Sequence, residues 1–219
     1  MKQRSLLIVG TGTVAEIAGY YFTTDSNYEL IGFVDHHEFA RTQKSLMDRP
    51  IFPTEVALAK FRQADADFFV AVGYQRTNSV RQKRYEEIKR SGYQCATYIS
   101  SKANVMTQDV GENCMILENN VLQPFAKIGN NVTMWSGNHL GHHSTIEDHS
   151  FIASHVVISG KCKIGRNSFL GVNCCLHDGV EIGEKSVVGA GSIVTRSCEA
   201  RSVFMPHNTE PRIIHRDII

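Results

Sequence analysis

The sequence predicts two parts in one chain: a small α/β domain with a parallel sheet, and then a left-handed parallel β-helix made of hexapeptide repeats. Three observations lead to this prediction. Apolar strand-like runs alternate with helical segments in the first part, a glycine-rich turn follows the first of these runs, and an aliphatic residue recurs at every sixth position from Val110 to Val194. We expect residues 1–100 to form the first domain, and residues 101–219 to form the β-helix with a C-terminal tail.

The first domain begins with strands separated by helices. LLIVG (6–10) is typical of a buried strand, and a helix is expected from the next turn to about Thr23. YELIGFVD (28–35) and DFFVAVG (67–73) predict two further strands, and CATYIS (95–100) predicts a last one. This alternation favours a small parallel sheet.

A charge-rich helix is expected before the last of these strands. It carries Tyr85 and Ile88 toward the sheet, and the charged residues of QKRYEEIKR (82–90) are expected to form a solvated face. Arg76 and Arg81 lie near the start of this helix. They can either meet a diphosphate or remain solvated.

The glycine-rich turn has the pattern G-x-G-x-x-A between the first strand and the first helix, with Gly10 and Gly12 as its glycines. Such a turn lets backbone N–H groups approach a phosphate at the positive end of a helix. Asp35 ends the second strand, where a ribose-binding acid would lie. The competing interpretation is a tight turn that only needs small residues. Because the sheet is about half the size of a full dinucleotide-binding domain, a nucleotide-linked sugar fits better than NAD.

The second part has a period of six without a break. The aliphatic or Met positions are Val110, Ile116, Leu122, Ile128, Met134, Leu140, Ile146, Ile152, Ile158, Ile164, Leu170, Leu176, Ile182, Val188 and Val194. Two residues before most of them lies a second, mostly small residue, which is expected to fill the interior. In a three-sided β-helix, six residues form one face and eighteen form one turn.

The second series assigns interior roles to several polar or reactive residues. Cys114, Cys162 and Cys174 are expected to be small interior fillers. Asn120 and Asn138 are one turn apart, and we expect them to stack as a hydrogen-bonded ladder. The six cysteines form no C-x-x-C pair, so neither a zinc knuckle nor a dithiol motif is indicated.

Composition excludes some classes of partner. Lys and Arg (23) nearly balance Asp and Glu (22), which gives no electrostatic case for nucleic acid. No apolar run approaches the roughly 20 residues that span a bilayer. We therefore expect a cytoplasmic protein that begins at its mature end.

The order of these motifs resembles the bacterial nucleotide-sugar acetyltransferases, the family of bacillosamine N-acetyltransferase and NeuD-like sialic acid O-acetyltransferase. The resemblance covers nearly the whole chain: the G-x-G-x-x-A turn, the VAVG strand and the hexapeptide part with its G-H segment. It implies a homotrimer with acetyl-CoA in the groove between neighbouring β-helices, and N-acetylation of a nucleotide-linked amino sugar in surface glycan biosynthesis. The C-terminal VFMPHNTEPRIIHRDII differs from the G-x-P-A-K-like ending of many relatives.

The resemblance also assigns residues. The catalytic base falls on His142, and His143 follows it where relatives usually have an acid. The positions for the donor are Gly160, Gly171, Val172 and Gly189. On the nucleotide side the matching positions are Gly10, Gly12, Thr13, Asp35 and Gly73, and Arg76 and His139 are further candidates for substrate contact.

The repeat gives His142 a partner independently of the resemblance. Gly160 is 18 residues later, so it lies one turn away on the same face, at about 4.8 Å by ordinary strand spacing. Acetyl transfer needs a base for the nucleophile's proton and a donor for the oxyanion, and imidazole and a backbone N–H suit these tasks. Asp178 is two turns from His142, which is too far for a direct hydrogen bond by this spacing.

A metal site is the main competing interpretation of the histidine-rich stretch NHLGHHSTIEDH. His143, His149 and His155 are spaced by six, so they lie on three successive faces and cannot share an ion within one chain. A trimer interface could gather histidines from different chains, as β-helical carbonic anhydrases of the γ type do. We expect no metal. O-acetylation of a sugar hydroxyl and a non-catalytic binding or assembly role both stay open as functions.

Overall fold

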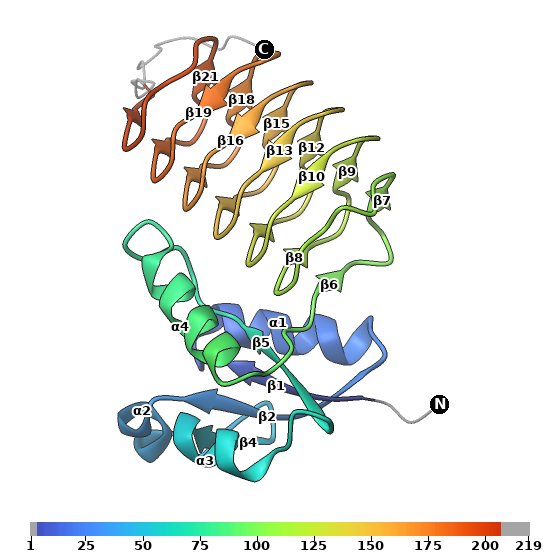
Figure 1. Ribbon diagram of the computed structural model, residues 1–219, viewed down its shortest axis with the longest axis vertical. Helices are drawn as coiled ribbons and strands as arrows, with labels where there is room; N and C mark the ends of the chain where they lie inside the picture. The colour runs from blue at the N-terminus through green and yellow to red at the C-terminus, as the bar shows by residue number, and fades with distance from the viewer. Residues whose placement is uncertain (1–3, 207–219) are drawn as a thin grey trace, which may run out of the picture.

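A computed structural model of the protein describes residues 4–206. Figure 1 shows an α/β domain at one end and a three-sided prism of short strands stacked on it. The parallel strands and their regular stacking confirm the predicted fold class, an α/β domain followed by a left-handed β-helix. The last part of the C-terminal segment, beyond Pro206, lies outside the described residues.

The α/β domain contains a five-stranded sheet in the order β3-β4-β2-β1-β5. Strands β1, β2, β4 and β5 are parallel, and β3 is antiparallel to β4. The elements are β1 (Arg4–Val9), α1 (Thr13–Thr24), β2 (Tyr28–Asp35), α2 (His37–Thr42), β3 (Ser45–Leu46), β4 (Arg49–Pro53), α3 (Thr54–Lys60), β5 (Ala66–Val70) and α4 (Ser79–Arg90). The first two predicted strands and the first helix are confirmed, whereas β5 is shorter than predicted.

Helices cover both faces of this sheet. Helix α1 packs on one face through Ala15, Ala18 and Phe22, and that cluster continues into the base of the prism. Helices α3 and α4 contribute to the cluster on the other face. The first turn is tight because Gly10 has φ +118 and a Cβ there would lie 2.7 Å from the Ala71 carbonyl oxygen.

The prism consists of three parallel sheets of two-residue strands. The seven-stranded sheet contains β6 (Tyr98–Ile99), β8 (Met115–Ile116), β11 (Thr133–Met134), β14 (Phe151–Ile152), β17 (Phe169–Leu170), β20 (Val187–Val188) and β22 (Val203–Phe204). The six-stranded sheet contains β7 (Asn104–Val105), β9 (Val121–Leu122), β12 (His139–Leu140), β15 (Val157–Ile158), β18 (Cys175–Leu176) and β21 (Ile193–Val194). The four-stranded sheet contains β10 (Lys127–Ile128), β13 (Thr145–Ile146), β16 (Lys163–Ile164) and β19 (Glu181–Ile182).

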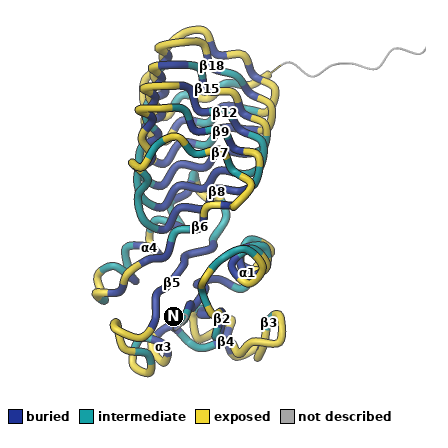
Figure 2. Tube along the Cα trace, turned by 90° about the vertical axis from the view of Figure 1, so that its right-hand side faces the viewer, coloured by how far each residue is buried: buried dark blue, intermediate teal, exposed yellow. Residues whose placement is uncertain are grey.

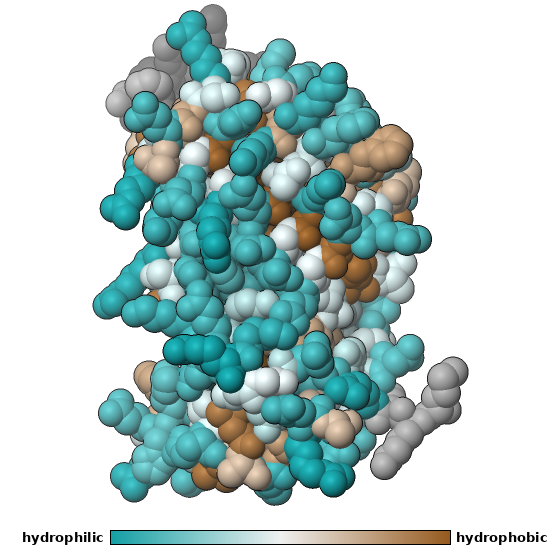
Figure 3. All heavy atoms as spheres, viewed as in Figure 1, coloured by the Kyte–Doolittle hydropathy of each residue, from teal (hydrophilic) through white to brown (hydrophobic). Residues whose placement is uncertain are grey.

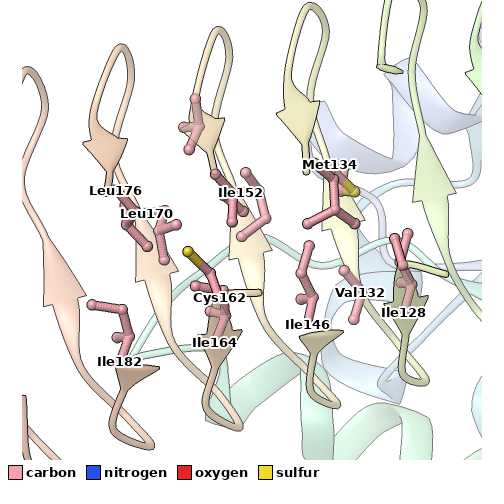
Figure 4. Close-up of a cluster of buried hydrophobic side chains, with 14 of the residues drawn as sticks. Ile128, Val132, Met134, Ile146, Ile152, Cys162, Ile164, Leu170, Leu176 and Ile182 are labelled. Carbon is pink, nitrogen blue, oxygen red and sulfur yellow. The ribbon is translucent and has the colours of Figure 1, made fainter. Parts of the chain in front are cut away.

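The interior of the prism follows the predicted series. From β8 to β21, each strand pairs with the strand 18 residues away, and the second residue of each strand points inward. The spacing is 16 or 17 residues where β6, β7 and β22 join the stack. Figure 4 shows such side chains converging from successive turns, among them Ile128, Met134, Ile146 and Ile152. Figure 2 shows the buried core and exposed corners of the same prism.

The small interior residues behave as expected with one exception. Cys114, Cys162 and Cys174 are buried and unpaired, and burial raises the pKa of the Cys114 thiol to about 12. The predicted ladder between Asn120 and Asn138 is wrong, because the two amides do not bond to each other. Both donate instead to the carbonyl oxygen of Trp135. The backbone carbonyls of a β-helix corner point inward and therefore compete for these amides.

The connection between the two parts differs from the prediction. CATYIS is not one strand of the α/β sheet: Cys95 forms a single bridge with Phe68, and Tyr98–Ile99 already belongs to the prism. The chain thus passes from one sheet to the other within three residues. The domain boundary near residue 100 stays a prediction.

Helix α4 is not the solvated helix that its charges predicted. Arg81, Arg84 and Tyr85 are buried, since the helix packs against one corner of the prism. Arg81 donates to the carbonyl oxygens of His149 and Ser150, at 2.7 and 3.0 Å. Arg81 is therefore neither a diphosphate ligand nor a solvated residue, and both of the roles that the sequence suggested for it are wrong.

The outer surface of the prism is uneven. Outward positions of the four-stranded sheet carry charges such as Lys127, Lys163 and Glu181, whereas Val157 and Ile193 are exposed on the six-stranded sheet. Figure 3 shows one view dominated by hydrophilic side chains, with hydrophobic atoms gathered toward its right-hand side. Across residues 4–206, we find no helix of the length and apolarity that crossing a bilayer requires.

Candidate active site

The glycine turn, the end of β2 and the segment after β5 enclose a cavity of about 340 Å³. It brings together five residues predicted from the sequence: Gly10, Gly12, Thr13, Asp35 and Gly73. Helix α1 begins at Thr13 with Gly12 before it, so its positive end faces this cavity. Backbone N–H groups at the start of α1 can therefore bind a phosphate in this cavity.

Asp35 is held by the protein itself. Its carboxylate accepts hydrogen bonds from the Thr11 hydroxyl at 2.7 Å and from the His36 backbone N–H at 2.8 Å. Arg84 Nη2 lies 3.7 Å from Asp35 Oδ1, and Nη1 of the same guanidinium contacts the His36 ring. One carboxylate oxygen thus faces a hydroxyl and the other a cation.

His36, Phe39 and Arg84 are among the residues of this cavity that were not predicted from the sequence. Arg84 could not be found from the pattern because its charge indicated a solvated helix face. Phe39 is 57% exposed beside the cavity, an exposure that would suit stacking against a planar ring. His36 could have been predicted from the sequence, because it directly follows Asp35.

Arg76 does not join these residues. It lines a separate cavity with Thr77, Ser79, Lys185 and Arg201, where the loop before α4 meets the last turns of the prism. The structure therefore separates Arg76 from the glycine turn, with which the sequence had grouped it as a candidate for substrate contact.

His142 lies at the corner between β12 and β13, on the edge joining the six-stranded and four-stranded sheets. Its backbone N–H donates to Gln123 Oε1 at 2.9 Å, and its carbonyl accepts from Lys161 N–H at 2.9 Å. These bonds to the turns on either side fix the backbone of the corner. The His142 side chain is exposed at this corner.

Gly160 lies directly beside the imidazole, as the repeat predicted. A Cβ on Gly160 would lie 2.7 Å from His142 Cε1 and 2.8 Å from Nε2, so the ring occupies the space that a side chain would need. The same Cβ would lie 3.2 Å from Asp178 Oδ1. His142 Nε2 and the Asp178 carboxylate therefore face one small space above Gly160.

The Gly160 N–H, the predicted oxyanion donor, already has an acceptor. It donates to Asp178 Oδ1 at 2.9 Å. Asp178 thus reaches one turn toward His142 without bonding to it, consistent with the spacing argument. The repeat spacing gave no sign that the carboxylate would take up this N–H.

The other positions assigned to the donor lie elsewhere on the prism. Gly171 and Val172 follow β17, and Gly189 follows β20, which places all three on the edge between the seven-stranded and six-stranded sheets. His142 and Gly160 lie on the next edge. His139 points outward from β12, on the sheet between the two edges, and is partly exposed. Within one chain, the edge with His142 and Gly160 is therefore separate from the edge with the other donor positions.

The three histidines spaced by six residues are separated as expected. His143, His149 and His155 occupy three different corners, each with φ near +60. His149 is buried beneath α4, where burial and then Arg166 lower its pKa to about 4. Residues 4–206 contain no group of three His, Cys, Asp or Glu side chains arranged to hold a metal ion.

Comparison with known proteins matches both parts of the chain. Residues 5–88 match the PglD N-terminal domain, residues 126–160 match the bacterial transferase hexapeptide, and residues 162–196 match the hexapeptide repeat of succinyl-transferase.

Several solved structures are similar over most of their length. The acetyltransferase domain of PglB from Neisseria gonorrhoeae FA1090 is 21% identical with a TM-score of 0.77, covering 89% of this chain and 92% of that one. PerB from Caulobacter crescentus, in complex with CoA and GDP-perosamine, is 22% identical with a TM-score of 0.78, covering 91% and 92%. WeeI from Acinetobacter baumannii AYE is 17% identical with a TM-score of 0.67, covering 91% and 95%.

These structures share the fold of this chain, and the matched models identify its parts. A PglD-type domain joined to transferase hexapeptide repeats is the combination that the sequence motifs indicated. The chain thus combines a PglD N-terminal domain over residues 5–88 with transferase hexapeptide repeats over residues 126–160 and 162–196.

Proposed function

We propose that the protein is an acetyl-CoA-dependent N-acetyltransferase that acts on a nucleotide-linked amino sugar, with His142 as general base. The observation that carries this proposal is the stacking of the His142 imidazole on Gly160, with Asp178 facing the same space. The perosamine N-acetyltransferase structure contains CoA and GDP-perosamine, and a PglB structure contains acetyl-CoA. These complexes support both the donor and the class of acceptor.

The chemistry follows from the geometry of this corner. The acceptor nitrogen attacks the thioester carbonyl carbon, its proton passes to His142 Nε2, and the C–S bond breaks. The CoA sulfur leaves as a thiolate that takes up that proton. Gly160 N–H is the proposed donor to the oxyanion, so the arriving thioester oxygen must replace the Asp178 carboxylate as its acceptor.

Asp178 supports an amine rather than a hydroxyl as the acceptor. A sugar amine arrives largely as an ammonium ion, which a carboxylate beside the base attracts, and it releases its extra proton to solvent before the nitrogen attacks. A hydroxyl gains no such charge interaction. O-acetylation of a sugar hydroxyl stays the second candidate. It would use the same base and the same donor.

The cavity at the glycine turn is the proposed site of the nucleotide. Backbone N–H groups at the start of α1 would bind the diphosphate, and Asp35 with Thr11 would meet the ribose. Phe39 would cover the base. This role explains why a small parallel sheet precedes the β-helix.

The assembly proposed for this function is a homotrimer. His142 and Gly160 lie on a different edge from Gly171, Val172 and Gly189, so a groove lined by both groups needs two neighbouring chains. Val157 and Ile193, exposed on the sheet between these edges, offer apolar surface for that contact.

The test is turnover on defined acceptors. We expect CoA release when the protein meets acetyl-CoA and one of a panel of UDP-, dTDP- and GDP-linked 3- or 4-amino-6-deoxy sugars, with mass spectrometry locating the acetyl group on nitrogen. Acetylation only of the matching hydroxy sugars would establish O-acetylation. Binding of a nucleotide sugar without any acetyl transfer would instead favour the non-catalytic role.

A further inference from the structure

The two adjacent histidines at the catalytic corner are directly bonded through equivalent ring atoms. Nδ1 of His142 lies 3.1 Å from Nδ1 of His143, and the two rings meet edge to face at 85°. A neutral imidazole carries one N–H and one lone pair, so one ring must donate to the other. The direction of this hydrogen bond decides which nitrogen of His142 can act as a base.

The position of His143 is set by the repeat. Its φ is 59, the left-handed conformation that this kind of corner also imposes on Asn113, Asn131 and Asn167. Its ring packs against Phe125, one turn earlier in the stack, with centroids 4.7 Å apart and an interplanar angle of 36°. Backbone and ring are thus both held, and Nδ1 is presented to His142.

We propose that His143 is a positioning residue that accepts the His142 Nδ1–H. This hydrogen bond fixes the tautomer of His142 that leaves a lone pair on Nε2, the atom beside Gly160. The inference rests on the proposed function for its catalytic consequence, but the tautomer is a property of the protein without any substrate. His143 then serves as a neutral acceptor in this hydrogen bond.

A neutral acceptor makes the base sensitive to acid in a particular way. A single proton added to the pair occupies either His142 Nε2 or His143 Nδ1. In the second case His143 becomes the donor and His142 carries its hydrogen on Nε2. In both cases Nε2 of His142 carries a hydrogen and has no lone pair with which to accept a proton. A carboxylate in place of His143 would always accept, and would also stabilise the imidazolium.

Other charges near the pair are few in the turns stacked on it. Lys161 is at the corner one turn beyond His143, and Asp178 faces His142 across Gly160. Both would be present in every variant compared below, so their effect on the pH profile cancels between variants.

Three variants of His143 separate positioning from packing. His143→Ala removes the acceptor, and we expect kcat to fall by at least about tenfold while the KM for acetyl-CoA is unchanged. His143→Asn restores an acceptor oxygen near the place of Nδ1 in a residue that this corner already uses, so it should rescue kcat relative to alanine. His143→Glu supplies a carboxylate acceptor, so its kcat should also exceed that of the alanine variant.

A matched control is His149→Asn, a histidine with φ 63 at the corner between the four-stranded and seven-stranded sheets, away from both groups of site positions; it should leave kcat at pH 7 unchanged. If His142→Ala is inactive but His143→Ala has wild-type kcat and pH profile, the positioning role is overturned and the proposed function stands. If no acceptor is acetylated by the wild type, the proposed function fails.

Nitrogen-15 NMR of histidine-labelled full-length protein tests the hydrogen bond without turnover. We expect the Nδ1–H tautomer of His142 in the wild type and its loss in His143→Ala. An Nε2–H tautomer of His142 in the wild type would overturn the inference whatever the activity.

Discussion

Replacing Gly160 by alanine should lower activity by up to about 100-fold without unfolding the protein. A Cβ there would approach His142 Cε1 and Nε2 to 2.7 and 2.8 Å. Non-bonded atoms of this kind prefer about 3.5 Å, so the ring must retreat by roughly 0.7 Å. A displacement of this size at a base can cost up to about 100-fold in rate, or roughly 2.7 kcal/mol in the activation free energy. The imidazole is exposed and can swing away, so the free energy of unfolding should change little.

The matched control is Gly165→Ala in the same turn. A Cβ on Gly165 would lie 2.6 Å from Glu184 N and 2.7 Å from the Ile182 carbonyl oxygen, which are backbone atoms that cannot move aside. We expect Gly165→Ala to lower the thermal midpoint, and Gly160→Ala to lower kcat/KM for CoA release at an unchanged midpoint. A Gly160→Ala protein with wild-type kcat/KM would refute the placement of the base beside this glycine.

Three further predictions concern stability. The Asp25 carboxylate accepts hydrogen bonds from the Tyr98 hydroxyl and from the Ser101 backbone N–H, and such bonds lower its pKa to about 2. Asp25→Asn should therefore lower the thermal midpoint at pH 7. The difference in midpoint between the variant and the wild type should shrink toward pH 2, where acid protonates the wild-type carboxylate. Because the pKa of His149 falls to about 4 on folding from an ordinary 6.5, the wild type should lose up to about 3 kcal/mol of unfolding free energy between pH 7 and pH 4, and urea titrations of His149→Asn should not show that loss. Arg81→Ala should cost about 3 kcal/mol in the same measurement, because it leaves a cavity and the His149 carbonyl without its donor, whereas Arg81→Met should cost less because it refills the space.

The hexapeptide period predicted the prism almost completely. A single chemical requirement, one aliphatic side chain per face, repeats at a fixed interval, and the stacking of turns follows from that interval alone. It also placed His142 beside Gly160, because residues 18 apart must be neighbours in such a stack. Nothing in this inference depended on contacts between the two parts of the chain.

Contacts between the parts explain what the sequence did not predict. The charges of α4 predicted a solvated helix face, yet Arg81 donates to backbone carbonyls of the prism and Arg84 lines the cavity at the glycine turn. A periodic pattern predicts which face of a helix is apolar. It does not predict whether the polar face packs against another part of the chain. The bond between His142 and His143 was also beyond the pattern, because it depends on ring orientation at a left-handed corner.

The most direct test of the central claim is the effect of His142→Ala on turnover with the best amino-sugar acceptor. We predict that kcat falls by about 10²- to 10⁴-fold, the usual range for a general base, while calorimetry shows unchanged affinity for CoA. Turnover at the wild-type rate in His142→Ala, with the acetyl group still delivered to the sugar amine, would contradict the role of His142 as the base.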